Sequence, residues 1–216
     1  MALDVLQRLG ELKVIPVIAI EDAASASPMG DALVAGGLPI AEVTFRTAAA
    51  EAAIKTLAKR GDLLVGAGTV LNIDNVKKAV DGGAQFIVTP GFNDKVVSYC
   101  VEHKIPITPG TVTATEIGLA LDYGLHAVKF FPAEAFGGIK TLKAIAVVFG
   151  MMKFVPTGGI TPENLGDYLK FNQVLACGGS WMVTKELLAN KQFDKIRELA
   201  RQAVDLAAKA RPAGGK

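Results

Sequence analysis

Residues 40–68, IAEVTFRTAAAEAAIKTLAKRGDLLVGAG, contain one complete strand–helix–strand unit. The runs IAEVTF (40–45) and LLVGAG (63–68) are short and apolar, as buried strands are, and an Ala-rich segment that opens at Thr47 lies between them. Its Thr at the start and Gly at the end are the cap residues expected of a helix. A helical crossover lets the second strand run parallel to the first, so this stretch predicts a βαβ unit.

The same unit recurs along the chain, at intervals of about two dozen residues, which suits a compact crossover helix and two short loops. Eight parallel strands in a chain of 216 residues favour an α/β fold in which the sheet closes into a single (β/α)8 TIM barrel. An open doubly wound sheet is the alternative. The remaining predicted strands are VIPVIAI (14–20), FIVTP (86–90), IPITPG (105–110), AVKFFP (127–132), KFVPTGG (153–159) and VLACGGS (174–180).

Helices are also expected at both ends of the barrel sequence. Residues 2–10 resemble a short leading helix, and residues 191–210 place apolar side chains on one helical stripe. The tail RPAGGK (211–216) is expected to be disordered. Because no linker or change of composition interrupts this order, residues 1–216 are predicted to form one domain.

Composition excludes several classes of partner. Half of the residues are hydrophobic, and 23 Lys and Arg balance 21 Asp and Glu, so no strong field points to nucleic acid or an anionic membrane. Charged residues interrupt the first 20 positions, which argues against a signal peptide or a membrane span and predicts a cytoplasmic protein. Cys100 and Cys177 have no metal-ligand or CxxC spacing and are expected to be reduced, buried thiols.

Polar residues interrupt the second predicted strand on one face. Alternation places Glu42, Thr44 and Arg46 toward the barrel interior, rising toward the C-terminal rim where the chemistry of such barrels is found. Branched apolar residues would be expected there if the strand only filled the core. The alternative is a structural ion pair between Glu42 and Arg46 that plugs the barrel.

The sixth predicted strand carries Lys129 between apolar neighbours. Desolvation by residues such as Phe131 and a nearby cation such as Arg46 would both favour the free amine, which is a nucleophile. The alternative is an electrostatic role, in which Lys129 pairs with Glu42 or binds an anion. Lys13 and Lys153 precede their strands and are expected to be solvated at the opposite end.

Two glycine turns follow the seventh and eighth predicted strands. TGGI (157–160) and CGGS (177–180) would let main-chain N–H groups approach an anion, with Thr161–Pro162 opening a helix and Ser180 donating its hydroxyl. These rim positions match the usual phosphate site of such barrels. Glycine pairs also occur as plain turns, which is the alternative.

The remaining candidates are weaker. Thr69 and Pro90 end the third and fourth predicted strands, where they could line a pocket or simply form turns. His103 and His126 are expected on the surface. The chain has no metal-ligand spacing, no dinucleotide-binding fingerprint and no GxSxG elbow, so no cofactor and no metal are predicted.

Taken together, these motifs resemble the 2-keto-3-deoxy-6-phosphogluconate (KDPG) and 4-hydroxy-2-oxoglutarate (KHG) aldolase family. The resemblance spans the second to the eighth predicted strand. It implies a class I, metal-independent lyase of carbohydrate metabolism that forms a Schiff base and releases pyruvate and glyceraldehyde 3-phosphate, commonly as a homotrimer. It rests on EVTFRT (42–47), GAGTV (66–70), VKFFPAE (128–134), PTGGI (156–160) and GGSW (178–181).

The resemblance also implies a role for each matched residue. Lys129 would be the Schiff-base lysine, Glu42 the general acid and base, and Arg46 with Thr69 the binders of the pyruvyl carboxylate. Pro90 and Phe131 would shape the pyruvate pocket. The phosphate or other distal group would be bound by Thr157, Gly158, Gly159, Gly179 and Ser180.

One departure from the family's pattern concerns the first predicted strand, which ends in Ile20 and Glu21 where some relatives carry a basic residue. Substrates derived from phosphogluconate, phosphogalactonate and hydroxyoxoglutarate all share the pyruvyl half, so the sequence leaves them open. A phosphate-binding isomerase or synthase in which Lys129 is only a charge, and a non-catalytic oligomeric barrel used as a scaffold, are the rival functions.

Overall fold

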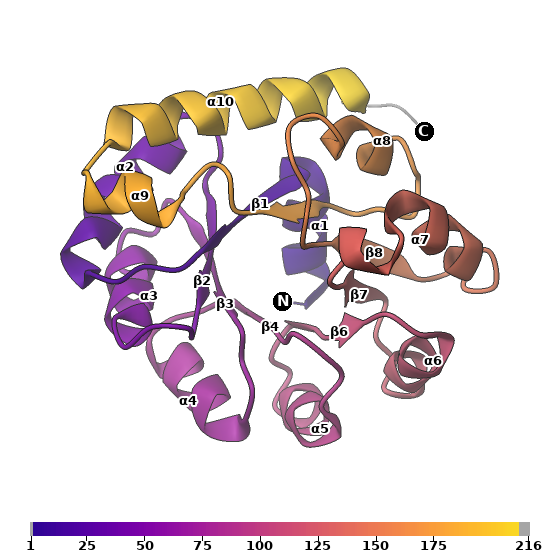
Figure 1. The fold of residues 1–216 in the computed structure, drawn as a ribbon. Helices are drawn as coiled ribbons and strands as arrows, with labels where there is room; N and C mark the ends of the chain where they lie inside the picture. Colours follow the sequence, from indigo (N-terminus) through magenta and orange to yellow (C-terminus); the bar gives the residue numbers. More distant parts are fainter. Residues whose placement is uncertain (1, 212–216) are drawn as a thin grey trace.

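The computed structural model describes the backbone of residues 2–211 and the side chains from Asp4 to Arg211. Strands and helices alternate along the chain, and Figure 1 shows the strands gathered in the centre with most of the helices around the outside. The strands are β1 (Val14–Ile18), β2 (Ile40–Thr44), β3 (Leu64–Gly68), β4 (Phe86–Val88), β5 (Ile107–Thr108), β6 (Gly110–Thr111), β7 (Ala127–Phe130), β8 (Lys153–Pro156) and β9 (Cys177–Gly179).

The helices cover the outer faces of the strands. Two short 3₁₀ helices, η1 (Ala23–Ser25) and η2 (Glu134–Phe136), follow β1 and β7. The α-helices are α1 (Ala2–Leu12), α2 (Ala26–Ala35), α3 (Ala50–Ala58), α4 (Ile73–Asp81), α5 (Asp94–Glu102), α6 (Ala114–Asp122), α7 (Gly138–Ala146), α8 (Leu165–Leu169), α9 (Lys185–Ala189) and α10 (Phe193–Ala210).

All the strand pairs are parallel, and they form two sheets. Six strands are ordered β5-β4-β3-β2-β1-β9, and three are ordered β6-β7-β8. Within the larger sheet, the strands from β5 to β1 are adjacent in chain order, whereas a doubly wound sheet reverses its order at a switch point. The parallel α/β architecture predicted from the sequence is therefore present, and the doubly wound alternative is not.

A proline separates the two sheets near the end of the predicted fifth strand. Residues 105–110 were expected to form one strand, but the structure has β5 and β6 on either side of Pro109. Proline has no N–H to donate to a strand ladder, so the pairing changes partner there. β5 pairs with β4, whereas β6 pairs with β7, and the Pro109 carbonyl accepts a hydrogen bond of 2.9 Å from Lys129 N.

Isolated parallel bridges connect the other edges of the sheets. Phe154 pairs with Val174, and Thr157 pairs with Gly178, so the end of β8 runs beside the segment that contains β9. β9 in turn pairs with β1, in the register Ile15 to Gly178. These contacts place the C-terminal ends of β8, β9 and β1 next to one another.

The expectation that Thr47 caps the helix after the second strand is wrong, because α3 has Ala49 as its N-cap and Thr47 donates to the Ile20 carbonyl at 2.5 Å. Other helices do begin at side-chain caps. Asn72 begins α4 by accepting a hydrogen bond of 2.8 Å from Asn75 N, and Thr113 with Glu116 forms a capping box at α6. The leading and C-terminal helices are both confirmed, as α1 and α10. α8 starts at Leu165, so the expectation that Thr161–Pro162 opens this helix is wrong, and a turn occupies those positions.

The C-terminal end of α10 is anchored at the edge of the barrel strands. The Arg211 guanidinium donates to the carbonyls of Val174 and Leu175 at 2.7 and 2.9 Å. Lys13, expected to be solvated, is half-buried and donates to the Arg211 carbonyl at 2.5 Å. Arg211 was assigned to the disordered tail and is instead hydrogen bonded; residues 212–216 of that tail lie outside the described residues.

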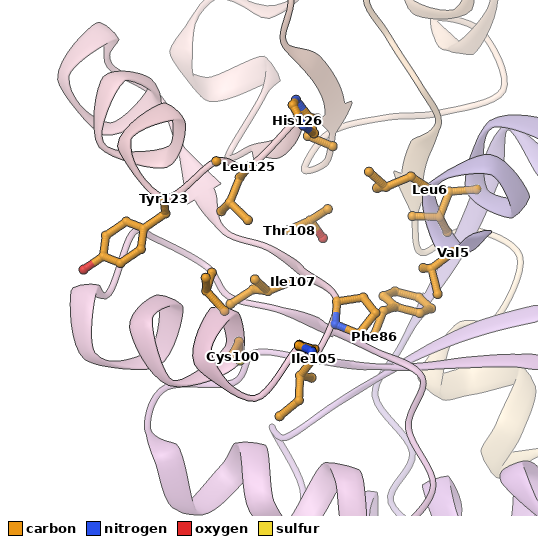
Figure 2. Close-up of a pocket in the computed structure, with 16 residues that line it drawn as sticks. Val5, Leu6, Phe86, Cys100, Ile105, Ile107, Thr108, Tyr123, Leu125 and His126 are labelled. Atoms are coloured by element: carbon orange, nitrogen blue, oxygen red, sulfur yellow. The ribbon is translucent and has the colours of Figure 1, made fainter. Parts of the chain in front are cut away.

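A cavity of about 480 Å³ lies between α1 and the starts of β4, β5 and β7 (Figure 2). Its walls are mostly apolar, with Leu6 and Val5 from α1 facing Phe86 and Ile107. This is the N-terminal end of the strands, which in barrels of this type serves stability rather than chemistry. Among the described residues that line it, no acid is paired with a base.

Cys100 and Cys177 are both buried and are free thiols. Burial raises the pKa of Cys100 to about 12, and burial also raises the pKa of Cys177. The thiolate is the reactive form of cysteine, so both groups should be inert near neutral pH.

We therefore expect the native protein to react with neither iodoacetamide nor Ellman's reagent at pH 8. In denaturant, both Cys100 and Cys177 should react, which provides the control for reduced thiols. Rapid labelling of either cysteine in the native protein would contradict the buried environment.

Candidate active site

A lysine and a glutamate meet where the two sheets face each other. Lys129 on β7 places its Nζ 3.5 Å from Oε1 of Glu42 on β2, and their side chains are only 7% and 2% exposed. That separation is longer than a hydrogen bond, and Glu42 Oε1 has no hydrogen-bond partner within residues 2–211. A buried carboxylate without hydrogen bonds is costly, which makes this pair a candidate reactive site.

Gly68 at the end of β3 makes room for the carboxylate. A Cβ on Gly68 would lie 2.3 Å from Glu42 Oε1, so any larger residue would displace Glu42. Gly68 was not predicted to be a site residue. A glycine inside a strand often marks a close approach of another group, and the GAG segment contains that signal.

The walls around Lys129 are largely as predicted. The Phe131 ring centroid lies 4.9 Å from Lys129 Nζ, close enough for the ring face to attract the ammonium while excluding water. Gly110 pairs with Lys129 across the strands, and a Cβ on Gly110 would lie 2.2 Å from the Pro90 carbonyl oxygen. The Pro90 main chain therefore lies against the strand beside the lysine.

Arg46 is oriented by a hydroxyl rather than by an acid. Its Nε donates to Thr44 Oγ1 at 2.9 Å, and Thr44 donates to the Ile18 carbonyl at 2.7 Å. In the described part of the chain, no ion pair joins Glu42 to Arg46, so the alternative of a structural plug between them is wrong. The Nη groups of Arg46 have no hydrogen-bond partner among these residues, so their N–H groups can donate to a carboxylate.

A cavity of about 150 Å³ brings most of the predicted binding residues together at the C-terminal ends of the strands. It contains Arg46 and Phe131 together with both glycine turns. Ile160 and Gly178, which belong to the two predicted glycine turns, also line it, and Val17 is a lining residue that was not predicted. The predicted residues that line it are Arg46, Phe131, Thr157, Gly158, Gly159, Gly179 and Ser180.

The first glycine turn has a backbone conformation that requires glycine. Gly158 and Gly159 adopt φ angles of +94° and +82°, which side-chain-bearing residues rarely adopt. Within residues 2–211, the N–H groups of Gly158, Gly159 and Ser180 donate to no backbone carbonyl. They are therefore free for an anion in the cavity.

Thr69 and Pro90 do not line this cavity. Thr69 follows Gly68, and its φ of +53° is unusual for a β-branched residue. Such a conformation persists only where the surrounding structure imposes it, as at ligand sites. Both residues lie on the side of the rim that carries Gly68 and the Pro90 contact with Gly110.

Other candidates are on the surface or absent. Glu21, the departure from the family's pattern, is exposed and pairs with Lys185 of α9 at 2.7 Å. His103 and His126 are exposed, as expected. Across the described residues, no group of three or more His, Cys, Asp and Glu could hold a metal ion, and no helix is long and apolar enough to cross a membrane.

This combination of a buried lysine, an adjacent carboxylate, a free guanidinium and an anion cradle defines a class of enzyme site that acts on an anionic carbonyl compound. The model of the family described as "KDPG and KHG aldolase" matches residues 5–199. The chain belongs to this aldolase family.

Relatives with high identity cover nearly the whole chain. It is 45% identical to 2-dehydro-3-deoxy-phosphogluconate aldolase of Haemophilus influenzae over 203 residues, which is 94% of this chain and 96% of that protein. It is 47% identical to KHG/KDPG aldolase of Escherichia coli over 193 residues, which is 89% of this chain and 91% of that protein.

Solved structures of the same family are similar to this chain over nearly its whole length. The 2-keto-3-deoxy-6-phosphogluconate aldolase of Zymomonas mobilis with 3-phosphoglycerate matches with a TM-score of 0.87 and 42% identity, covering 93% of this chain and 95% of that one. The KDPG aldolase of Legionella pneumophila, with pyruvate captured as a covalent carbinolamine intermediate, also has a TM-score of 0.87, with 39% identity and coverage of 90% and 97%.

The buried pair itself makes a prediction about stability. Lys129→Met should lower the free energy of unfolding by about 3 kcal/mol, because it leaves the Glu42 carboxylate buried without a cation. The double variant Glu42→Gln/Lys129→Met should lose less than the single Lys129→Met variant. Urea unfolding measures both, with the exposed Lys153→Met as a control. If the double variant loses as much unfolding free energy as the Glu42→Gln and Lys129→Met variants together, the two residues are uncoupled.

Proposed function

We propose that this chain is a class I aldolase whose Lys129 forms a Schiff base with pyruvate. Its substrate is 2-dehydro-3-deoxy-6-phosphogluconate, which it cleaves to pyruvate and glyceraldehyde 3-phosphate. The observation that carries this proposal is the buried Lys129 Nζ, 3.5 Å from a Glu42 oxygen that has no hydrogen-bond partner within residues 2–211. The relatives' names support the substrate.

The first half of the reaction builds the imine. The Lys129 amine attacks the ketone carbon of the substrate, and the resulting carbinolamine loses water. The Glu42 carboxylate takes the proton that Lys129 gives up to become a free amine, and it later donates this proton to the departing hydroxyl beside the lysine. The product is a protonated imine, and its positive nitrogen is an electron sink.

The second half breaks the carbon–carbon bond. Glu42, now a carboxylate, removes the proton of the C4 hydroxyl, the C3–C4 bond breaks, and its electron pair flows into the imine to give an enamine. The aldehyde leaves with the distal phosphate. Protonation of the enamine at C3 and addition of water then release pyruvate and restore Lys129, so no oxidant, metal or cofactor is required.

Two regions of the rim would bind the ends of the substrate. Arg46 and Thr69 bind the pyruvyl carboxylate, and Arg46 can do so with two parallel hydrogen bonds because its Nη groups are free. Pro90 and Phe131 shape the pyruvate pocket. The phosphate lies in the small cavity, against the free N–H groups. It is bound there by Thr157, Gly158, Gly159, Gly179 and Ser180.

The remaining features of the proposal concern the fold and the assembly. We propose that β5 and β6 are one strand interrupted by Pro109 and that the chain forms a single (β/α)8 TIM barrel in one domain, 1–216. The bridges from β8 to the β9 segment support this proposal. A cytoplasmic homotrimer follows from the family resemblance. One structural relative, at 28% identity, is part of a cage built from symmetric oligomeric domains.

Other functions are less well supported. A "KDPGal" structure matches at 28% identity, below the 42% of the Zymomonas enzyme, which favours the phosphogluconate-derived substrate over the phosphogalactonate-derived one. Cleavage of 4-hydroxy-2-oxoglutarate to pyruvate and glyoxylate is a second activity that the Escherichia coli relative's name supports. A non-catalytic scaffold has no need to bury Lys129 against Glu42.

Trapping with borohydride tests the Schiff base. Incubation with pyruvate and sodium borohydride should add the mass of one reduced pyruvyl group, and peptide mapping should locate it on Lys129. Lys129→Ala should abolish the adduct, while Lys153→Ala should retain it. An adduct that persists in Lys129→Ala, or no adduct in the wild-type protein, would exclude this mechanism.

Glu42 is tested separately from the lysine. Glu42→Gln should lower kcat by about 100-fold, because general acid–base catalysis of this kind contributes at least that much, while the pyruvate adduct should still form. Glu51→Gln, on the exposed face of α3, is the matched control. Steady-state cleavage measures the effect, and full activity of Glu42→Gln would remove Glu42 from the mechanism.

A further inference from the structure

A tyrosine–carboxylate contact joins two elements on either side of the first glycine turn. The Tyr168 hydroxyl on α8 donates a hydrogen bond to Glu134 Oε1 on η2. Tyr168 is only 1% exposed, and burial together with Glu134 raises the pKa of its hydroxyl. The hydroxyl therefore stays protonated as a donor across the physiological pH range.

Glu134 is also packed directly against the glycine turn. Its backbone N–H donates to the Gly158 carbonyl at 3.0 Å, and the neighbouring Ala133 N–H donates to the Thr157 carbonyl at 2.8 Å. A Cβ on Gly159 would lie 2.6 Å from both Cβ and Cγ of Glu134. The stem of the glutamate thus occupies the space that a side chain at residue 159 would need.

The turn depends on such outside contacts because glycine has no side chain of its own to hold it. Two successive glycines with positive φ have many alternative conformations, and ordering them costs entropy at each binding event unless the surroundings do so in advance. Asn164 provides a second contact, since its Nδ2 donates to the Gly159 carbonyl at 2.9 Å. The carbonyls of the turn are thereby bound, while the N–H groups of Gly158 and Gly159 are left free.

We propose that Glu134 and Tyr168 are positioning residues that hold the Gly158–Gly159 backbone in its anion-binding conformation. This inference rests on the proposed function. The pair sets the affinity for the phosphorylated end of the substrate. It contributes nothing to the chemistry at Lys129, which is paired instead with Glu42.

The binding of the two ends of the substrate can be measured separately. The Michaelis constant for 2-dehydro-3-deoxy-6-phosphogluconate reports on both ends, whereas the pyruvate concentration that gives half-maximal borohydride trapping reports on the pyruvyl end alone. Tyr168→Phe and Glu134→Ala should each raise KM about fivefold, a typical effect of one net hydrogen bond, and leave the half-maximal pyruvate concentration unchanged.

A matched control exists on the outside of the molecule. Tyr123 donates to Asp94 Oδ1 at 2.6 Å, which is another tyrosine–carboxylate hydrogen bond, away from the glycine turn. Tyr123→Phe should change neither quantity. The double variant Tyr168→Phe/Glu134→Ala should raise KM no further than Glu134→Ala alone, because both changes remove the same contact.

Several outcomes would overturn the inference. If both variants fold and KM is unchanged, the contact does not position the turn. If the half-maximal pyruvate concentration for trapping rises by the same factor as KM, the role of the contact is general stability rather than recognition of the phosphate. Should Tyr168→Phe fail to fold, Glu134→Ala answers the question alone, since Glu134 is exposed. A wild-type protein that traps no pyruvate would instead overturn the proposed function, on which the inference rests.

Discussion

The fold brings a cation and a carboxylate together in an apolar interior, and the rest of the site depends on that pair. Lys129 and Glu42 come from different sheets, so their 3.5 Å separation depends on how the two sheets face each other. Burying two charges without hydrogen bonds opposes folding. The surrounding core of branched apolar side chains has to offset that cost, and the absent Cβ of Gly68 provides the space for the carboxylate.

Much of the fold was predictable because each element is specified locally. β-branched runs, Ala-rich segments and cap residues such as Asn72 are signals within a few residues of the element that they define. The split at Pro109 was not predicted, although the proline was visible, because its effect depends on which neighbouring strand each half pairs with. The late start of α8 has a similar cause, since Asn164 hydrogen bonds to Thr161 N and Gly159 O and so forms a turn first.

The site was predictable to the extent that alternation within a strand fixes a direction. Alternation placed Glu42 and Arg46 on one face, and Lys129 was conspicuous among apolar neighbours. In the structure, Arg46 and both glycine turns line the same cavity. The partners of these residues could not be predicted in the same way. Alternation cannot show that Arg46 bonds to Thr44, nor that Tyr168 reaches Glu134 across 34 positions, because such contacts depend on the tertiary arrangement.

In the proposed mechanism, the lysine of the buried pair is the nucleophile. A crystal structure of the protein soaked with pyruvate tests this most directly. We expect continuous density from Lys129 Nζ to the pyruvyl carbon, with the carboxylate against the Arg46 guanidinium and Glu42 within hydrogen-bond distance of the new carbon–nitrogen bond. Pyruvate bound without a covalent link, or attached to another lysine, would contradict it.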